Sequence, residues 1–160
     1  MSAVREGGCS CGAVRYRLTA EPLFVNCCHC RNCQRQTGTA FAINLLIEAD
    51  RLELGGVEPV EVALPRDDGT TQRVLRCPHC QVALYSHYSR GDVCFVRAGT
   101  LDDPHDVVPD VHIFTRSKVP WVIIPESQPA FDVFYDLPAQ WSAESLERLA
   151  ALNERVIGEG

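Results

Sequence analysis

The stretch Cys27-Cys28-His29-Cys30-Arg31-Asn32-Cys33 determines how the rest of the chain must be arranged. The spacing Cys28-x-Cys30-x-x-Cys33 brings three thiols within reach of one metal ion in a single turn of backbone. A structural zinc site has four protein ligands, whereas a reactive site keeps one position for water or substrate. Three thiols without an evident fourth ligand therefore indicate an open metal site, which the remaining residues must hold and cover. We call these residues the three-cysteine cluster.

The sequence leaves the fourth ligand of this cluster open. Cys27 and His29 each adjoin a cysteine of the cluster, which makes their geometry awkward for the same ion. More distant candidates are His79, His87, His112 and Cys94. The alternative of three core cysteines without metal is weak, because a cysteine that serves as a small hydrophobic residue usually stands alone. An open zinc site would prefer a soft ligand such as the thiolate of a small molecule.

Two further cysteine pairs, Cys9-x-Cys11 and Cys77-x-x-Cys80, each supply half of a tetrahedral ligand set. Together they predict a closed structural zinc site that joins the N-terminal strand to the middle of the chain. The alternative is that the two pairs never meet. Disulfides are disfavoured, because the nine cysteines are an odd number and no export signal precedes them. The isolated Cys94 is typical of a core residue.

Length and charge restrict the class of protein. A chain of 160 residues suits one domain with a real core. The net charge of -6 argues against a nucleic-acid partner, which usually requires a basic face. No stretch approaches the roughly 20 apolar residues of a membrane helix, and the N-terminus has no apolar signal-peptide core. We therefore expect a cytoplasmic protein without nucleic-acid or membrane partners.

Short strands between turn signals predict a mainly β fold. Residues 14–18 alternate strictly and predict a half-buried strand with Val14, Tyr16 and Leu18 inward. A short helix over residues 30–36 should end at Gly38. Further strands are expected over residues 23–25, 40–47, 57–64, 82–88, 93–98, 111–114 and 121–124, with a hairpin tip at Asp67-Asp68-Gly69.

The C-terminal residues have a helical period. Apolar residues line one side of 143–157, Ser142 is a suitable N-cap, and Gly158 is a stop signal. We expect a zinc-binding β domain over residues 1–141, followed by an amphipathic helix over 142–160. That helix packs either on the same domain or on a second subunit, which makes a homodimer one expected arrangement.

Both cysteine sets and the segments between them resemble the glutathione-dependent formaldehyde-activating enzyme family, over roughly residues 5–135. The matching segments are Gly8-Cys9-Ser10-Cys11-Gly12-Ala13-Val14, Cys28-His29-Cys30-Arg31-Asn32-Cys33-Gln34-Arg35 with Gly38, Cys77-Pro78-His79-Cys80, Ala98-Gly99-Thr100-Leu101-Asp102, Pro109-Asp110-Val111-His112-Ile113-Phe114, and Ser117-Lys118 with Trp121. One departure is Gln81, which stands where the family usually has glycine.

The resemblance implies a zinc-stabilised set of small antiparallel sheets (the β-tent) with two Zn²⁺ ions. The structural ion would lie on Cys9, Cys11, Cys77 and Cys80, and the reactive ion on Cys28, Cys30 and Cys33. The implied activity is that of S-(hydroxymethyl)glutathione synthase, a carbon–sulfur lyase. Glutathione carboxylates need cationic or hydrogen-bond donors. The expected substrate-binding residues are Arg31, Arg35, His112 and Lys118, with Arg116 nearby.

The leading hypothesis is thus an enzyme in which a zinc-activated thiol adds to an aldehyde. The alternative is a non-catalytic zinc-stabilised β scaffold that binds a thiol or a protein partner, with the C-terminal helix as its contact surface. A third hypothesis is a redox enzyme like the methionine-sulfoxide reductases, which share a related fold. It needs a free catalytic cysteine, and only Cys27 or Cys94 could fill that role.

Overall fold

The computed structural model describes residues 4–88 and 92–158. Its strands are β1 (Arg5–Gly8), β2 (Val14–Leu18), β3 (Phe24–Cys28), β4 (Ala42–Glu48), β5 (Leu52–Gly56), β6 (Val60–Pro65), β7 (Thr71–Arg76), β8 (Ala83–His87), β9 (Val93–Arg97) and β10 (Val111–Ile113). The α-helices are α1 (Arg31–Thr37), α2 (Leu137–Gln140) and α3 (Ala143–Gly158), and the 3-10 turns are η1 (Ala49–Arg51), η2 (Ala98–Thr100) and η3 (Thr115–Ser117).

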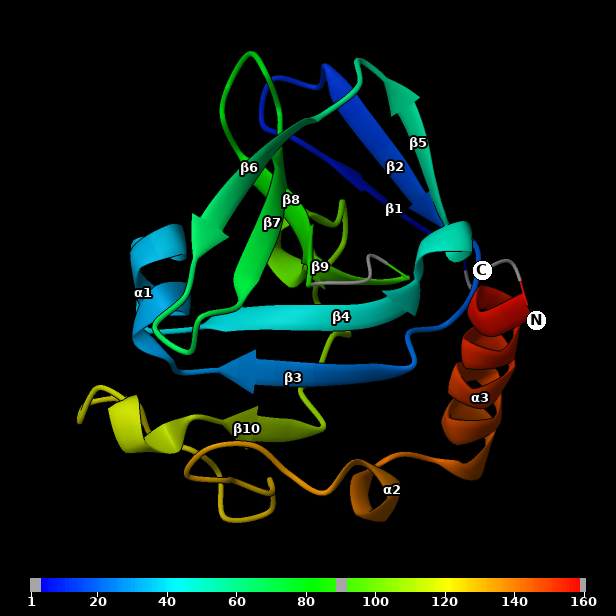
Figure 1. The fold of residues 1–160 in the computed structure, drawn as a ribbon. Helices are drawn as coiled ribbons and strands as arrows, with labels where there is room; N and C mark the ends of the chain where they lie inside the picture. The colour runs from blue at the N-terminus through cyan, green and yellow to red at the C-terminus, as the bar shows by residue number, and fades with distance from the viewer. Residues whose placement is uncertain (1–3, 89–91, 159–160) are drawn as a thin grey trace.

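The strands form two sheets (Figure 1). The smaller has the order β1-β2-β5, and the larger has the order β10-β3-β4-β9-β8-β7-β6. Every pair of neighbouring strands is antiparallel except β10 and β3, which run parallel. This architecture, with a helix at the C-terminus, confirms the mainly β fold that the short alternating segments predict.

The strict alternation of β2 has the predicted result. Val14, Tyr16 and Leu18 are almost completely buried and belong to one apolar core between the two sheets. Cys77 and Cys94 lie in the same core, so the isolated Cys94 is the core residue that its position suggests. Burial of this apolar surface is the main source of stability in a domain of this size.

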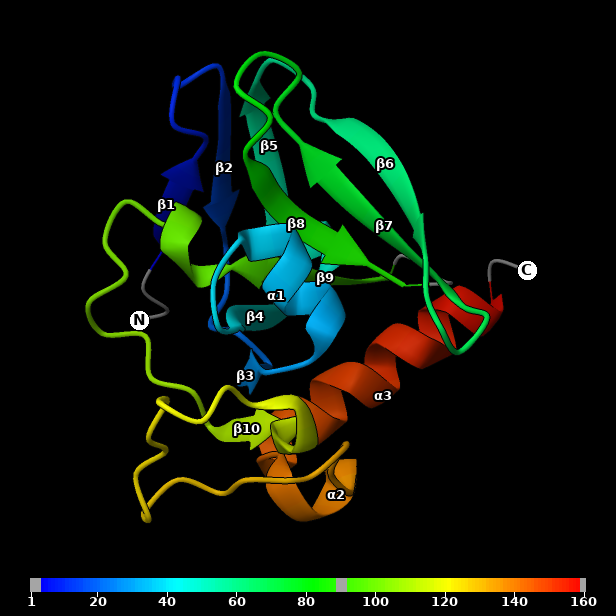
Figure 2. The same cartoon turned by 90° about the vertical axis from the view of Figure 1, so that its left-hand side faces the viewer.

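A second core lies between the β10–β3–β4 end of the large sheet and the C-terminal segments. Phe24, Tyr135 and Trp141 form its aromatic centre, and the Trp141 indole N–H donates to the Tyr135 hydroxyl at 3.0 Å. Helix α3 begins at a Ser142 cap, whose Oγ accepts from the Ser145 amide at 3.1 Å. Figure 1 shows α3 at one end of strands β3 and β4 and α1 at the opposite end, and Figure 2 views the molecule from the α1 end.

One predicted strand is wrong. Residues 121–124 form a turn and an irregular segment, and the side chains of Trp121 and Ile123 are 73% and 88% exposed. The flanking Pro120 and Pro125 confine the apolar run to a few residues, and proline cannot donate to a strand ladder. The sequence reading also missed β1, β5 and α2. None of the described helices is long and apolar enough to cross a membrane.

Candidate metal centre and active site

The three-cysteine cluster forms where β3 ends and α1 begins. Cys28 is the last residue of β3, Cys30 is the N-cap of α1, and Cys33 lies in the first turn. The Cys33 amide donates to the Cys30 sulfur at 3.3 Å, and Gly38 ends the helix in a left-handed conformation, φ +68°. The three sulfur atoms lie within 4.8 Å of one another. The strand-to-helix corner thus presents three thiols to a single point, as their spacing predicts.

The cluster is arranged to carry negative charge. Hydrogen bonds from the Cys28 and Cys33 thiols, and then from backbone amides, lower the pKa of Cys30. The same contact with Cys30 raises the pKa of Cys28, because the Cys28 proton is held in that bond. Within the described parts of the chain, no fourth Cys, His, Asp or Glu donor joins this group. The donor set therefore fits a soft divalent ion such as Zn²⁺ with one position left for another ligand.

The candidates for a fourth ligand lie elsewhere. Cys27, His29 and His112 form a separate buried group, in which His29 Nε2 lies 2.9 Å from His112 Nδ1 and 3.6 Å from the Cys27 sulfur. Parallel pairing places His112 beside Cys27, whereas Cys28 is the next residue of β3 and faces the other side of the sheet. Burial, then the nearby His112, lowers the pKa of His29 to about 4. These three residues pack behind the three-cysteine cluster as a buried hydrogen-bonded group.

The four-cysteine cluster consists of Cys9, Cys11, Cys77 and Cys80, and the fold brings both pairs together. The Cys9–Cys11 and Cys11–Cys77 sulfur distances are 3.5 and 3.7 Å, close to the roughly 3.8 Å that 2.3 Å zinc–sulfur bonds give in a tetrahedron. Backbone amides of Val14 and His79 also donate to these sulfurs. The group fits a closed structural zinc site. Gln81 adopts the left-handed turn, φ +65°, that favours glycine.

A cavity of about 240 Å³ lies over the three-cysteine cluster. All three cysteines line it, together with the aromatic rings of Tyr88, Phe95, Phe114 and Phe134 and the polar side chains of Asn26, Asn44, Gln72 and Arg66. Burial raises the pKa of Tyr88 above its ordinary range, so this hydroxyl remains protonated. The cavity therefore combines a metal-binding floor, apolar walls and several fixed hydrogen-bonding groups, as small-molecule sites commonly do.

A second cavity of about 200 Å³ adjoins the first and is lined by three arginines and two aspartates. Cys30, Asn32, Arg66 and Phe114 line both cavities, whereas Arg31, Arg116, Asp67 and Asp68 line only the second. Arg66 comes from the β6–β7 hairpin, and its guanidinium lies 5.1 Å from the centre of the Tyr88 ring. The two cavities together suit a thiol with an anionic group.

The residues expected to bind substrate have different positions. Arg31 lines the second cavity, whereas Arg35 is exposed on α1 and absent from the linings of both cavities. Lys118 donates to the carbonyls of Val119 and Val122. His112 belongs to the buried group behind the cluster.

The sequence reading missed Arg66 and the amide side chains of the cavity. Asn26, Asn44 and Gln72 lie in β3, β4 and β7. For Asn26 and Asn44 the only signal was a polar residue within a mainly apolar strand, which is unusual because a buried polar group needs a partner. Gln72 lies in the largely polar strand Thr71–Arg76 and gave no such signal.

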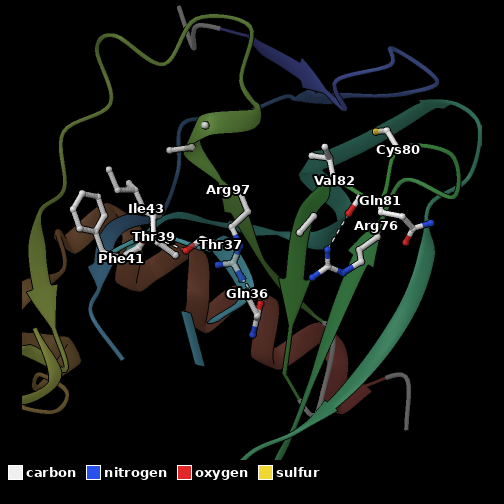
Figure 3. A pocket seen from close by; sticks show the side chains of 14 residues that line it. Gln36, Thr37, Thr39, Phe41, Ile43, Arg76, Cys80, Gln81, Val82 and Arg97 are labelled. Atoms are coloured by element: carbon white, nitrogen blue, oxygen red, sulfur yellow. Dashed lines mark hydrogen bonds between the residues drawn. The ribbon is translucent and has the colours of Figure 1, made fainter. Parts of the chain in front are cut away.

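A third cavity, of about 500 Å³, lies between α1 and the four-cysteine cluster. Gln36 and Arg97 line its α1 end, and Arg76, Cys80 and Gln81 line the other end (Figure 3).

Comparison with known proteins identifies the family of the chain. The family model for the glutathione-dependent formaldehyde-activating enzyme matches residues 4–117. A Halomonas elongata protein named "Putative glutathione-dependent formaldehyde-activating enzyme" is 33% identical over 150 residues, covering 90% of this chain and 95% of that protein. A crystal structure of a Rhodobacter sphaeroides protein is a distant likeness, with 17% identity, a TM-score of 0.46, and coverage of 79% of this chain and 98% of that one. The chain therefore belongs to the glutathione-dependent formaldehyde-activating enzyme family.

Proposed function

We propose that this protein is a zinc-dependent carbon–sulfur lyase that adds a small thiol, glutathione or a close relative, to formaldehyde or a similar aldehyde. The observation that carries the proposal is the three-cysteine cluster on the floor of a cavity, with no fourth protein donor within the described residues. Membership in a family of formaldehyde-activating enzymes supports the same reaction.

The two cysteine clusters have different roles in this proposal. Four thiolates close a structural site and leave no position for chemistry, whereas three thiolates leave one. When bound at the three-cysteine cluster, Zn²⁺ would lower the pKa of a substrate thiol and supply it as a thiolate. The soft donor sets of both clusters favour zinc at these positions.

The protein side chains orient the substrate and exclude water. Phe95, Phe114 and Phe134 line the cavity around the reacting sulfur. Arg31, Arg66 and Arg116, in the adjoining cavity, would hold the carboxylates of the thiol by charge-assisted hydrogen bonds. The thiol is then fixed at both ends, and the aldehyde reaches it through the remaining space. Holding both reactants together lowers the entropic part of the barrier.

The test is the exchange of formaldehyde between its hydrate and S-hydroxymethylglutathione, followed at equilibrium by NMR. The parent protein should accelerate the exchange, and Cys30→Ser should abolish the acceleration while the protein stays folded. Cys94→Ala, which removes a core thiol away from the cavity, is the matched control and should keep the acceleration. Equal acceleration by the Cys30→Ser variant would rule out this mechanism.

A further inference from the structure

A single buried arginine stands behind the amide side chains of the cavity. Arg97 is only 7% exposed, and within the described residues it forms no ion pair with a carboxylate. Its Nη1 donates to Asn44 Oδ1. Its Nη2 donates to Gln36 Oε1 at 2.9 Å, and Figure 3 shows these two side chains. The buried positive charge of Arg97 is thus hydrogen-bonded to the oxygens of two neutral amides.

The guanidinium fixes the orientation of both amides because it has five donors and no acceptor. Asn44 must turn Oδ1 toward Arg97, so its Nδ2 points the other way and donates to Asn26 Oδ1 at 3.2 Å. Asn26 in turn must present Oδ1 to Asn44. The Nδ2 group of Asn26 donates to no described residue, although Asn26 is 1% exposed and lines the cavity.

The sheet register makes this relay continuous. Asn26 pairs with Asn44 across β3 and β4, and Asn44 pairs with Arg97 across β4 and β9. Cys28 is two residues beyond Asn26 on β3, so both side chains face the same side of the strand, about 7 Å apart along it. A row of three side chains therefore ends beside the three-cysteine cluster.

The second branch from Arg97 ends differently. Gln36 Nε2 donates to Gln72 Oε1 at 2.6 Å, and Gln72 Nε2 donates to the Ser86 hydroxyl at 3.0 Å. The amides of Asn44, Gln36 and Gln72 therefore all donate away from Arg97. The second branch ends in a hydrogen bond to Ser86 inside the protein. The first branch ends at Asn26, whose N–H group has no partner among the described residues.

We propose that Asn26 is a catalytic hydrogen-bond donor that stabilises the oxyanion of the addition step, and that Arg97 and Asn44 are positioning residues that hold its N–H toward the cavity. This inference rests on the proposed function. The thiolate sulfur forms a bond to the carbonyl carbon, and the π electrons of the C=O bond move onto oxygen. Asn26 Nδ2–H donates to that oxygen, which then takes a proton from water to give the hydroxyl group of the product.

Asn26→Asp and Asn26→Ala test the donor. Asp keeps the acceptor that Asn44 needs but has no N–H, and Ala removes both groups. Loss of one oxyanion donor typically lowers kcat by about 10²- to 10³-fold, so we expect such a loss in both variants. For Asn26→Ala, the KM for glutathione and the zinc content should stay within about threefold of the parent. Asn153→Ala, on the distant helix α3, is the control.

A double variant tests the relay. Arg97→Met should lower kcat because Asn44 and Asn26 become free to rotate, and Arg97→Met combined with Asn26→Ala should be no slower than Asn26→Ala alone. Residues that act as one unit are non-additive, whereas a merely structural role of Arg97 would lower kcat further. If Arg97→Met does not fold, the two Asn26 variants decide alone.

The possible results separate the two proposals. An active parent with unchanged kcat in both Asn26 variants would overturn the donor role and leave the proposed function intact. A zinc-loaded parent that does not accelerate the exchange would overturn the proposed function, and the donor role with it. An additive double variant would overturn the positioning role of Arg97.

Discussion

The guanidinium of Arg148 holds both carboxylate oxygens of Glu48, with Nε–Oε1 and Nη2–Oε2 distances of 2.9 and 2.6 Å. The side chain of Glu48, the last residue of β4, is only 5% exposed. Arg148 also donates to the Glu21 carbonyl at 3.0 Å. This bidentate contact joins helix α3 to strand β4, which pairs with β3, the strand that carries Cys28.

Removal of Arg148 should therefore be costly. Arg148→Met leaves the buried Glu48 carboxylate without its cation, and we expect a loss of about 3 kcal/mol in the free energy of unfolding. Arg155→Met is the matched control on the same helix, because Arg155 and Asp50 form an exposed pair and exposed pairs contribute little, about 0.5 kcal/mol. Urea denaturation of both variants measures the difference, and equal losses would contradict the anchoring role.

The four-cysteine cluster should determine the stability of the fold. Cys80→Ser removes one ligand, and we expect a loss of about 5 kcal/mol, since structural zinc contributes about 10 to 16 kcal/mol in small peptides. For a domain of this size, such a loss lowers the Tm by about 10 to 20 °C. Cys30→Ser, which affects the other cluster, should change the Tm by only a few degrees. Equal shifts in the two variants would show that the clusters do not differ in this way.

Gln81 should carry a conformational cost. Its φ of +65° lies in the left-handed region, so Gln81→Gly should raise the stability of the metal-loaded protein by about 0.5 to 1 kcal/mol. Gln81→Ala keeps that cost and loses the side-chain bond to the Pro78 carbonyl, so it should be no more stable than the parent. A Gly variant less stable than the parent would show that this bond matters more than the strain.

Arg66 should distinguish anionic from neutral thiols. Arg66→Gln is expected to raise the KM for glutathione by about tenfold, because a charge-assisted hydrogen bond contributes about 1.5 kcal/mol or more, and to leave the rate with 2-mercaptoethanol unchanged. Arg35→Gln provides the comparison, since Arg35 lines neither cavity over the cluster, and it should behave as the parent. Similar effects on both thiols would place Arg66 in a structural role.

Short-range features were predictable from the sequence because they depend on neighbouring residues. The alternation of Val14, Tyr16 and Leu18 predicted β2, and Gly38 predicted the end of α1. The spacing of Cys28, Cys30 and Cys33 also predicted that these three thiols lie together, whereas the contact between the pairs Cys9/Cys11 and Cys77/Cys80 is long-range and required the fold.

The remaining features depend on strand register, which the sequence does not reveal. The row of Asn26, Asn44 and Arg97 forms only because β3, β4 and β9 pair in one alignment. Parallel pairing likewise brings His112 beside Cys27. Residues 121–124 have the apolar composition of a strand, but they lie between Pro120 and Pro125, which limit strand pairing, and Trp121 is 73% exposed.

The most direct test of the account is the number of zinc ions per chain in reduced, untagged protein, before and after incubation with excess zinc. The parent should bind two ions, and the triple variant Cys28→Ser, Cys30→Ser, Cys33→Ser should bind one. One ion in both proteins, even after loading, would mean that the three-cysteine cluster holds no metal and would contradict the proposed function.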